Sequence, residues 1–156
     1  MLSYRHGFHA GNHGDVLKHL SQMLLIEKLK AKDKGFYYFD THSGAGVYQL
    51  DSVEAKKTNE FKQGIERVSE HVSDNSHIAE YLHLVNNYKK FAQYPGSPEI
   101  AKCLLRAQDK MVLMEWHNQE IKQLRSNIGG GGHVGDGMGG MMVVGGMLEM
   151  VWEVCW

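Results

Sequence analysis

The 156-residue sequence predicts an α/β fold, the first half of a doubly wound sheet, and one repeated pattern carries this prediction. An apolar and aromatic run, residues 36–39, ends on Asp40, and a second apolar run, residues 111–114, ends on Glu115. Helical periodicity fills much of the chain between the two runs. Because open α/β sheets bind nucleotide-like ligands at the carboxyl ends of their strands, we expect a ligand site beside Asp40 and Glu115.

A glycine turn follows the first predicted strand. Gly44 and Gly46 have no Cβ, so the backbone there can turn sharply and approach a bound molecule closely. Glu115, at the end of the second strand, is our candidate ribose ligand because a carboxylate offers two acceptor oxygens. The alternative interpretation is a tight loop after one strand and a surface acid after the other.

The N-terminal residues 1–14 have no apolar period and are interpreted as a loop or arm. A helix is expected to begin at Asn12, because Asn12 and Asp15 have the spacing of a capping pair. Its apolar face is expected to comprise residues 16, 17, 20, 23, 24 and 29, and the helix to end in the lysine-rich turn 30–34. Lys18 and His19 then lie in its first turns, beside the arm.

Residues 51–93 are charged and predict two amphipathic helices, which we interpret as an insertion over the ligand edge. The sequence Tyr94-Pro-Gly-Ser-Pro98 marks the next boundary, with Ser97 as helix cap and Pro98 at the first helical position. Ser97 has two possible roles, since its hydroxyl can cap its own helix or donate to a ligand. Asn118 is expected to begin a last short helix that reaches Arg125.

The composition excludes several classes of protein. Seventeen basic residues balance 18 acidic ones, so a nucleic-acid partner would need a local basic patch. The sequence contains no secretory signal and no apolar run long enough to cross a membrane, so we expect a cytoplasmic monomer. Cys103 and Cys155 form no disulfide framework. His9 and His13 have helical spacing, but Gly11 separates them and no further ligand is near, so no metal site is expected.

The chain changes character near residue 129. Ten of the eighteen residues 129–146 are glycine, and every Lys and Arg lies at or before Arg125. We therefore expect residues 1–128 to form the folded part and residues 129–156 a disordered tail that arose from a shifted reading frame or a truncated gene. The alternative is a genuine low-complexity tail. Val143, Val144 and residues 147–156 are apolar enough to adhere to an open sheet edge or to other chains.

Five segments resemble the RlmJ family of bacterial 23S ribosomal RNA adenine-N6 methyltransferases, which use S-adenosylmethionine. The resemblance covers residues 1–126 and implies a partial Rossmann-like methyltransferase domain with a helical insertion at 51–93. It also implies that His19, His42, Ser97 and Glu115 contact the cofactor, and that Tyr4 meets the RNA, either protein-free or in early assembly. The segments are His6, residues 9–19, 40–46, 94–98 and 114–117.

The sequence departs from the family at the catalytic motif. The family holds the adenine amine with an Asp-Pro-Pro-Tyr loop after a later strand, whereas this sequence has only Pro95 and Pro98, both in the turn described above. We therefore assign no catalytic residue. The resemblance implies the methyltransferase function for the family, and we expect this chain to be a truncated, inactive form of it. The alternative is a non-catalytic module that binds the cofactor or a nucleic acid, including the DNA-utilisation role with which some relatives are labelled.

Overall fold

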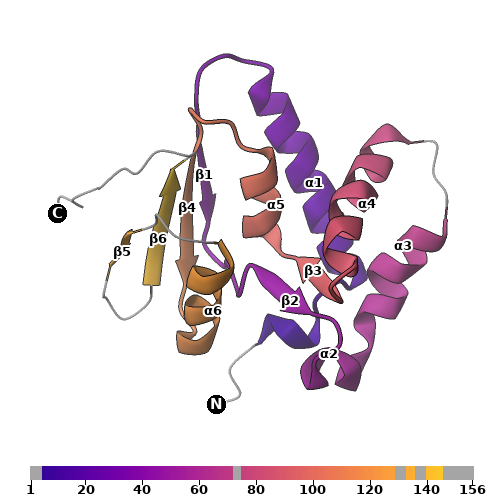
Figure 1. The fold of residues 1–156 in the computed structure, drawn as a ribbon. Helices are drawn as coiled ribbons and strands as arrows, with labels where there is room; N and C mark the ends of the chain where they lie inside the picture. Colours follow the sequence, from indigo (N-terminus) through magenta and orange to yellow (C-terminus); the bar gives the residue numbers. More distant parts are fainter. Residues whose placement is uncertain (1–4, 72–74, 129–132, 136–139, 146–156) are drawn as a thin grey trace.

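A computed structural model describes residues 5–71, 75–128, 133–135 and 140–145, and it contains two sheets (Figure 1). The larger sheet has the order β1-β4-β6-β5, in which only β1 and β4 are parallel. The smaller sheet pairs β2 and β3 in antiparallel fashion. The strands are β1 (Tyr37–Asp40), β2 (Val47–Gln49), β3 (Gln93–Pro95), β4 (Lys110–Glu115), β5 (His133–Gly135) and β6 (Gly140–Gly145).

Helices α1 and α5 lie beside β1 and β4, and α3 and α4 lie farther from the sheet, beyond α1 (Figure 1). The predicted α/β class is therefore confirmed. Among the described residues, no helix is both long enough and apolar enough to cross a membrane. The helices are η1 (His6–Phe8), α1 (His13–Lys30), α2 (Val53–Thr58), the π-helical turn η2 (Lys62–Glu66), α3 (Arg67–Glu70), α4 (Ser76–Lys89), α5 (Ser97–Leu104) and α6 (Asn118–Ile128).

The start of α1 is as predicted, but its buried face is not. Asn12 is the N-cap, and its side-chain oxygen accepts a hydrogen bond from the Asp15 backbone amide. Leu17, by contrast, is 70% exposed, whereas His19 is completely buried. Three polar side chains, Asp15, His19 and Gln22, thus occupy the inward face, where each has a hydrogen-bond partner. A periodicity count of apolar residues cannot detect this.

Strand β1 is only half buried, although its sequence is almost entirely aromatic. It is the end strand of the sheet order, and Tyr37 and Phe39 on one of its faces are 54% and 59% exposed. Their rings stack on each other with centroids 6.0 Å apart. The opposite face carries Tyr38, whose hydroxyl accepts a hydrogen bond from Gln22 of α1.

The insertion comprises α2, η2, α3 and α4 rather than two regular helices. It packs against α1 and β3. None of residues 51–93 lines the cavity described below, so our expectation that the insertion covers the ligand edge is wrong for that cavity. The reason is that its apolar residues, among them Ile65, Tyr81 and Val85, are completely buried in a core cluster shared with Tyr94 and Ile100.

Part of the expected disordered tail is instead ordered. Residues 140–145 pair with the whole of β4, and residues 133–135 pair with β6. The expectation that Val143 and Val144 adhere to the open sheet edge is confirmed. The free backbone groups along β4 and a Met-Met-Val-Val sequence suited to strands account for the pairing. Residues 129–132, 136–139 and 146–156 lie outside the described residues.

Candidate functional site

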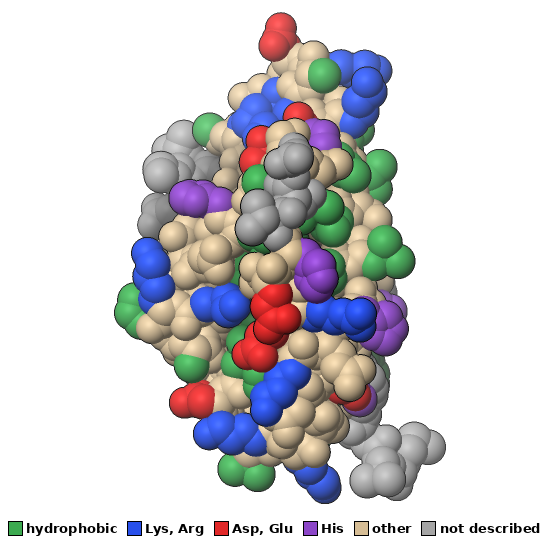
Figure 2. Space-filling model, turned by 90° about the vertical axis from the view of Figure 1, so that its right-hand side faces the viewer, with side chains coloured by type: hydrophobic (Ala, Val, Ile, Leu, Met, Phe, Trp, Pro, Cys, Tyr) green, Lys and Arg blue, Asp and Glu red, His purple; other side chains and the backbone are tan. Residues whose placement is uncertain are grey.

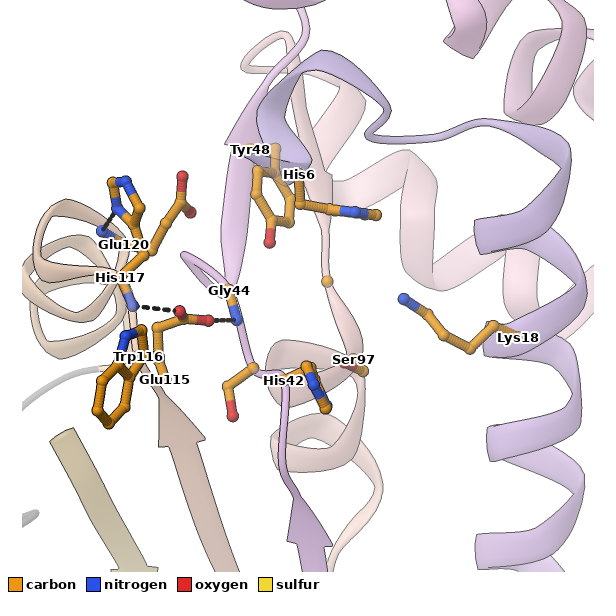
Figure 3. Close-up of a pocket in the computed structure, with 12 residues that line it drawn as sticks. His6, Lys18, His42, Gly44, Tyr48, Ser97, Glu115, Trp116, His117 and Glu120 are labelled. Carbon is orange, nitrogen blue, oxygen red and sulfur yellow. Dashed lines mark hydrogen bonds between the residues drawn. The ribbon is translucent and has the colours of Figure 1, made fainter. Parts of the chain in front are cut away.

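A cavity of about 400 Å³ lies where β1 and β4 end. Both strands run in the same direction, so their carboxyl ends and the loops that follow them meet at one edge of the sheet. Figure 3 shows that Lys18 approaches the cavity from α1, opposite Glu115, Trp116 and Glu120. The cavity is lined by His6, Lys18, His42, Ser43, Gly44, Tyr48, Gly96, Ser97, Glu115, Trp116, His117 and Glu120.

Glu115 bridges the two loops that form one wall of the cavity. One of its carboxylate oxygens accepts a hydrogen bond from the Gly44 amide, and the other accepts one from the His117 amide, each at 2.7 Å (Figure 3). Both bonds are charge-assisted and short. Each oxygen keeps one further lone-pair direction, so the carboxylate can still accept a hydrogen bond from a ligand hydroxyl.

The glycine turn meets two steric requirements of the site. Gly44 has φ +60°, a conformation that side chains rarely adopt, and a Cβ there would collide with the Tyr48 hydroxyl. That hydroxyl accepts a hydrogen bond from the Ala45 amide at 3.1 Å. Gly46 also has a positive φ, +76°, and its carbonyl accepts a hydrogen bond from the Gly96 amide at 2.7 Å. The turn is therefore held against both Tyr48 and the start of α5.

Ser97 is joined to the acid at the end of β1. Its hydroxyl donates to the Asp40 carboxylate at 2.6 Å. The structure places Gly96, not Ser97, at the N-cap of α5 and shows no side-chain cap there, so the predicted cap is wrong. The reason is that α5 already begins at Ser97, so Ser97 is not in the cap position and its hydroxyl is oriented toward the Asp40 carboxylate. Asp40 also accepts the His42 amide at 3.1 Å, which fixes the first residues of the loop.

Asp15 anchors the two basic side chains of the cavity. It accepts hydrogen bonds from His6 at 2.8 Å and from the Gly11 amide at 3.0 Å, and its other oxygen lies 3.0 Å from the Lys18 ammonium. Burial opposes its ionisation, but the hydrogen bond from His6 and the neighbouring positive charges outweigh this and lower the pKa of Asp15 well below its usual range. The Asp15 carboxylate itself does not line the cavity, whereas its partners His6 and Lys18 do.

His19 does not reach the cavity. Its ring is completely buried, stacks on Tyr94 with centroids 5.6 Å apart, and has its Nδ1 2.9 Å from the Tyr94 hydroxyl. Burial lowers the pKa of His19 to about 3, although the charge of Asp15 acts in the opposite direction. The neutral imidazole therefore lies in the core beside Tyr94. Its assignment to the cofactor stays a prediction.

Three of the predicted site residues, His42, Ser97 and Glu115, converge on the cavity. Tyr4 lies outside the described residues. His9 contacts Glu60 at 2.9 Å instead of joining His13. Within the described part of the chain, the group of side chains spaced to hold a metal ion is a different one, at the surface between α1 and α4: Glu27, His77 and Glu80.

The sequence interpretation missed several lining residues. Tyr48 enters the cavity because β2 pairs with β3. Nothing in these two short segments indicates that they pair, since 43 residues lie between them. Trp116, His117 and Glu120 follow Glu115 directly, and the rule that ligands bind beyond strand ends was a signal that could have found them. That rule does not indicate which of these three residues contacts a ligand.

The cavity lies at the carboxyl ends of two parallel strands, beside a glycine turn, which is the place where open α/β sheets bind nucleotide-like ligands. The family model of ribosomal RNA large subunit methyltransferase D, RlmJ, matches residues 33–135. The chain therefore belongs to the RlmJ family.

Relatives and a solved structure agree with this membership. Two proteins named ribosomal RNA large subunit methyltransferase J are each 50% identical, over 131 residues for the one from Haemophilus influenzae and 129 for the one from Escherichia coli. Each match takes in 81% of this chain and 47% or 46% of the relative, so the chain spans about half the length of these relatives. A crystal structure of a Legionella pneumophila protein superposes with a TM-score of 0.65 at 38% identity, covering 74% of this chain and 43% of that one.

Proposed function

We propose that this chain is the cofactor-binding part of a 23S ribosomal RNA adenine-N6 methyltransferase that uses S-adenosylmethionine. The observation that carries the proposal is the convergence of His42, Ser97 and Glu115 on one cavity at the ends of two parallel strands. Family membership supports the methyltransferase class, and the parallel β1–β4 pair with α5 as its crossover is compatible with a Rossmann-like domain.

Each wall of the cavity has a distinct task in this proposal. Glu115 accepts hydrogen bonds from the ribose hydroxyls, and the indole of Trp116, 75% exposed beside it, offers an apolar surface to the base. Lys18 on the opposite wall is available to the carboxylate of the amino-acid portion. Bound S-adenosylmethionine supplies a methyl group on a sulfonium centre. The residues described here bind and orient that group rather than exchange protons with it.

Tyr4 and the neighbouring arm are proposed to contact the RNA, whose target base must leave its stack to be modified. The face formed by α3 and α4 mixes acidic and basic side chains, so it presents no uniform basic field to RNA (Figure 2). This distribution favours the cavity side of the molecule for RNA contact. The further proposal of a cytoplasmic monomer rests on composition alone.

Titration of the wild-type chain with S-adenosylmethionine tests the proposal. Glu115→Ala removes a charged hydrogen-bond acceptor worth about 1.5 to 3 kcal/mol, so we expect the dissociation constant to rise roughly 10- to 100-fold. Glu70→Ala, an exposed acid on α3, is the matched control and should titrate like the wild type. Equal heats for wild type and Glu115→Ala would refute the role of Glu115, and no heat with the wild type would refute cofactor binding. Circular dichroism of each variant verifies that loss of the loop bridge has not unfolded it.

The second candidate function is a non-catalytic module that binds the cofactor or a nucleic acid. The sequence favours it for the 156 residues taken alone, because their two prolines, Pro95 and Pro98, lie at the end of β3 and the start of α5 and not in an Asp-Pro-Pro-Tyr loop. Cofactor binding without methyl transfer is the outcome that both functions share. Filter binding of single-stranded DNA and of 23S ribosomal RNA separates them, since comparable affinity for both nucleic acids supports a general binding module.

A further inference from the structure

Glu120 is a buried carboxyl group that lines the cavity. It lies in the first turn of α6 and is only 6% exposed. One of its oxygens, Oε2, is buried and has no hydrogen-bond partner among the described residues. The Nδ1 atom of His117 accepts the backbone amides of Gln119 and Glu120 at 3.3 and 3.5 Å, so the turn that carries Glu120 is held in place.

This position is unfavourable for a carboxylate in the empty protein. Burial raises the pKa of Glu120, and the charge of Glu115 raises it further, whereas Arg5 and nearby histidines oppose the shift. A buried acceptor without a partner costs free energy, and such groups in cavities are candidates for ligand contact. The helix dipole stabilises an acid in the first turn of a helix, but it would do so equally for an exposed side chain. The dipole therefore does not explain why Glu120 is buried.

The polarity of the cavity indicates which part of a ligand Glu120 faces. Glu115, Trp116 and Glu120 share one wall, and Lys18 lies across from them (Figure 3). Both oxygens of Glu115 already accept backbone amides at 2.7 Å, which leaves that residue with reduced capacity for ligand donors. On this wall, Glu115 already accepts two hydrogen bonds from the protein, whereas the Oε2 atom of Glu120 accepts none from the described residues.

We propose that Glu120 is a second carboxylate that binds the nucleoside part of the ligand, accepting a hydrogen bond from a hydroxyl or amine donor that Glu115 does not take. This inference rests on the proposed function, in which the cavity holds an adenosyl cofactor. Glu120 is thus a binding residue of the nucleoside end, and Lys18 on the opposite wall serves the amino-acid end.

The test compares Glu120→Gln with the wild type against two probes, S-adenosylhomocysteine and 5′-methylthioadenosine, which lacks the amino-acid portion. Because a charged acceptor forms a hydrogen bond roughly twice as strong as a neutral one, we expect the dissociation constant of both probes to rise roughly fivefold. The melting temperature of the ligand-free protein should rise, because glutamine removes a carboxylate whose ionised form is disfavoured in the folded state. Glu70→Gln, at an exposed position, should change neither quantity.

The outcomes separate this inference from the function on which it rests. If the wild type binds neither probe, both fail. If the wild type binds both and Glu120→Gln binds them equally well, only the role of Glu120 fails. A loss confined to S-adenosylhomocysteine would assign Glu120 to the amino-acid end, and a lower melting temperature would make it a support of α6; each overturns the proposal. Glu120→Ala repeats the comparison, with a larger loss expected, should the glutamine variant not fold.

Discussion

The 156-residue chain is expected to transfer no methyl group to ribosomal RNA, even when its cavity holds cofactor. The described cavity places binding groups at the ends of β1 and β4. The two prolines of the sequence, Pro95 and Pro98, flank the lining residues Gly96 and Ser97 and do not form an Asp-Pro-Pro-Tyr loop that could hold an adenine amine. Orientation and proximity together supply roughly 7 to 11 kcal/mol in well-aligned reactions, so their loss reduces the rate below detection. This is the largest effect that we predict.

The measurement is incorporation of labelled methyl from S-adenosylmethionine into protein-free 23S ribosomal RNA from a strain that lacks the intact methyltransferase. A full-length relative serves as positive control, and titration of the same 156-residue preparation shows whether it binds cofactor. Label above the no-protein background, and its loss with Tyr4→Ala, would demonstrate a catalytic centre within these residues and contradict the prediction.

The elements that local chemistry determines were predictable from the sequence. Asn12 caps α1 because its side-chain oxygen accepts a hydrogen bond from the backbone amide of Asp15, three residues later. Both groups lie within one short segment, so the sequence alone indicates the cap. The two apolar runs ending in Asp40 and Glu115 became parallel neighbours, since the helical residues between them allow the crossover connection that a parallel pair needs. From these two placements the position of the site followed.

Features that depend on distant partners were not predictable. Ser97 has good capping chemistry, but Asp40, 57 positions earlier, takes its hydroxyl. The contact between His19 and Tyr94, 75 positions later, which places the imidazole in the core, cannot be read from the sequence. Glu120 is one of several acids near a helix start, and its burial depends on how α6 packs against the rest of the fold, including the glycine turn that Asn127 contacts at the Ala45 carbonyl. In each case a long-range contact decided between two locally acceptable roles.

His19 should make the protein sensitive to mild acid. Its ring is buried as the neutral imidazole, and an imidazolium would carry an N–H at Nε2, a buried atom with no partner among the described residues. The pKa is lowered from 6.5 in the unfolded chain to about 3 in the fold, so the unfolded state binds the proton first. Stability is therefore fully present above pH 6.5 and is lost as the pH falls toward the folded value, by about 1.4 kcal/mol per pH unit.

Urea denaturation between pH 7.5 and roughly pH 4.5 measures this loss, which should approach 3 kcal/mol, about a third of the stability of an ordinary domain. His19→Gln remains neutral throughout and can still bond to the Tyr94 hydroxyl, so its stability should change far less with pH, although it starts from a lower value because the ring leaves a gap. His83→Gln, on the exposed side of α4, should keep the wild-type slope. An unchanged slope in His19→Gln would assign the acid sensitivity to another group, and a flat wild-type profile would mean that the imidazolium finds an acceptor in the folded protein.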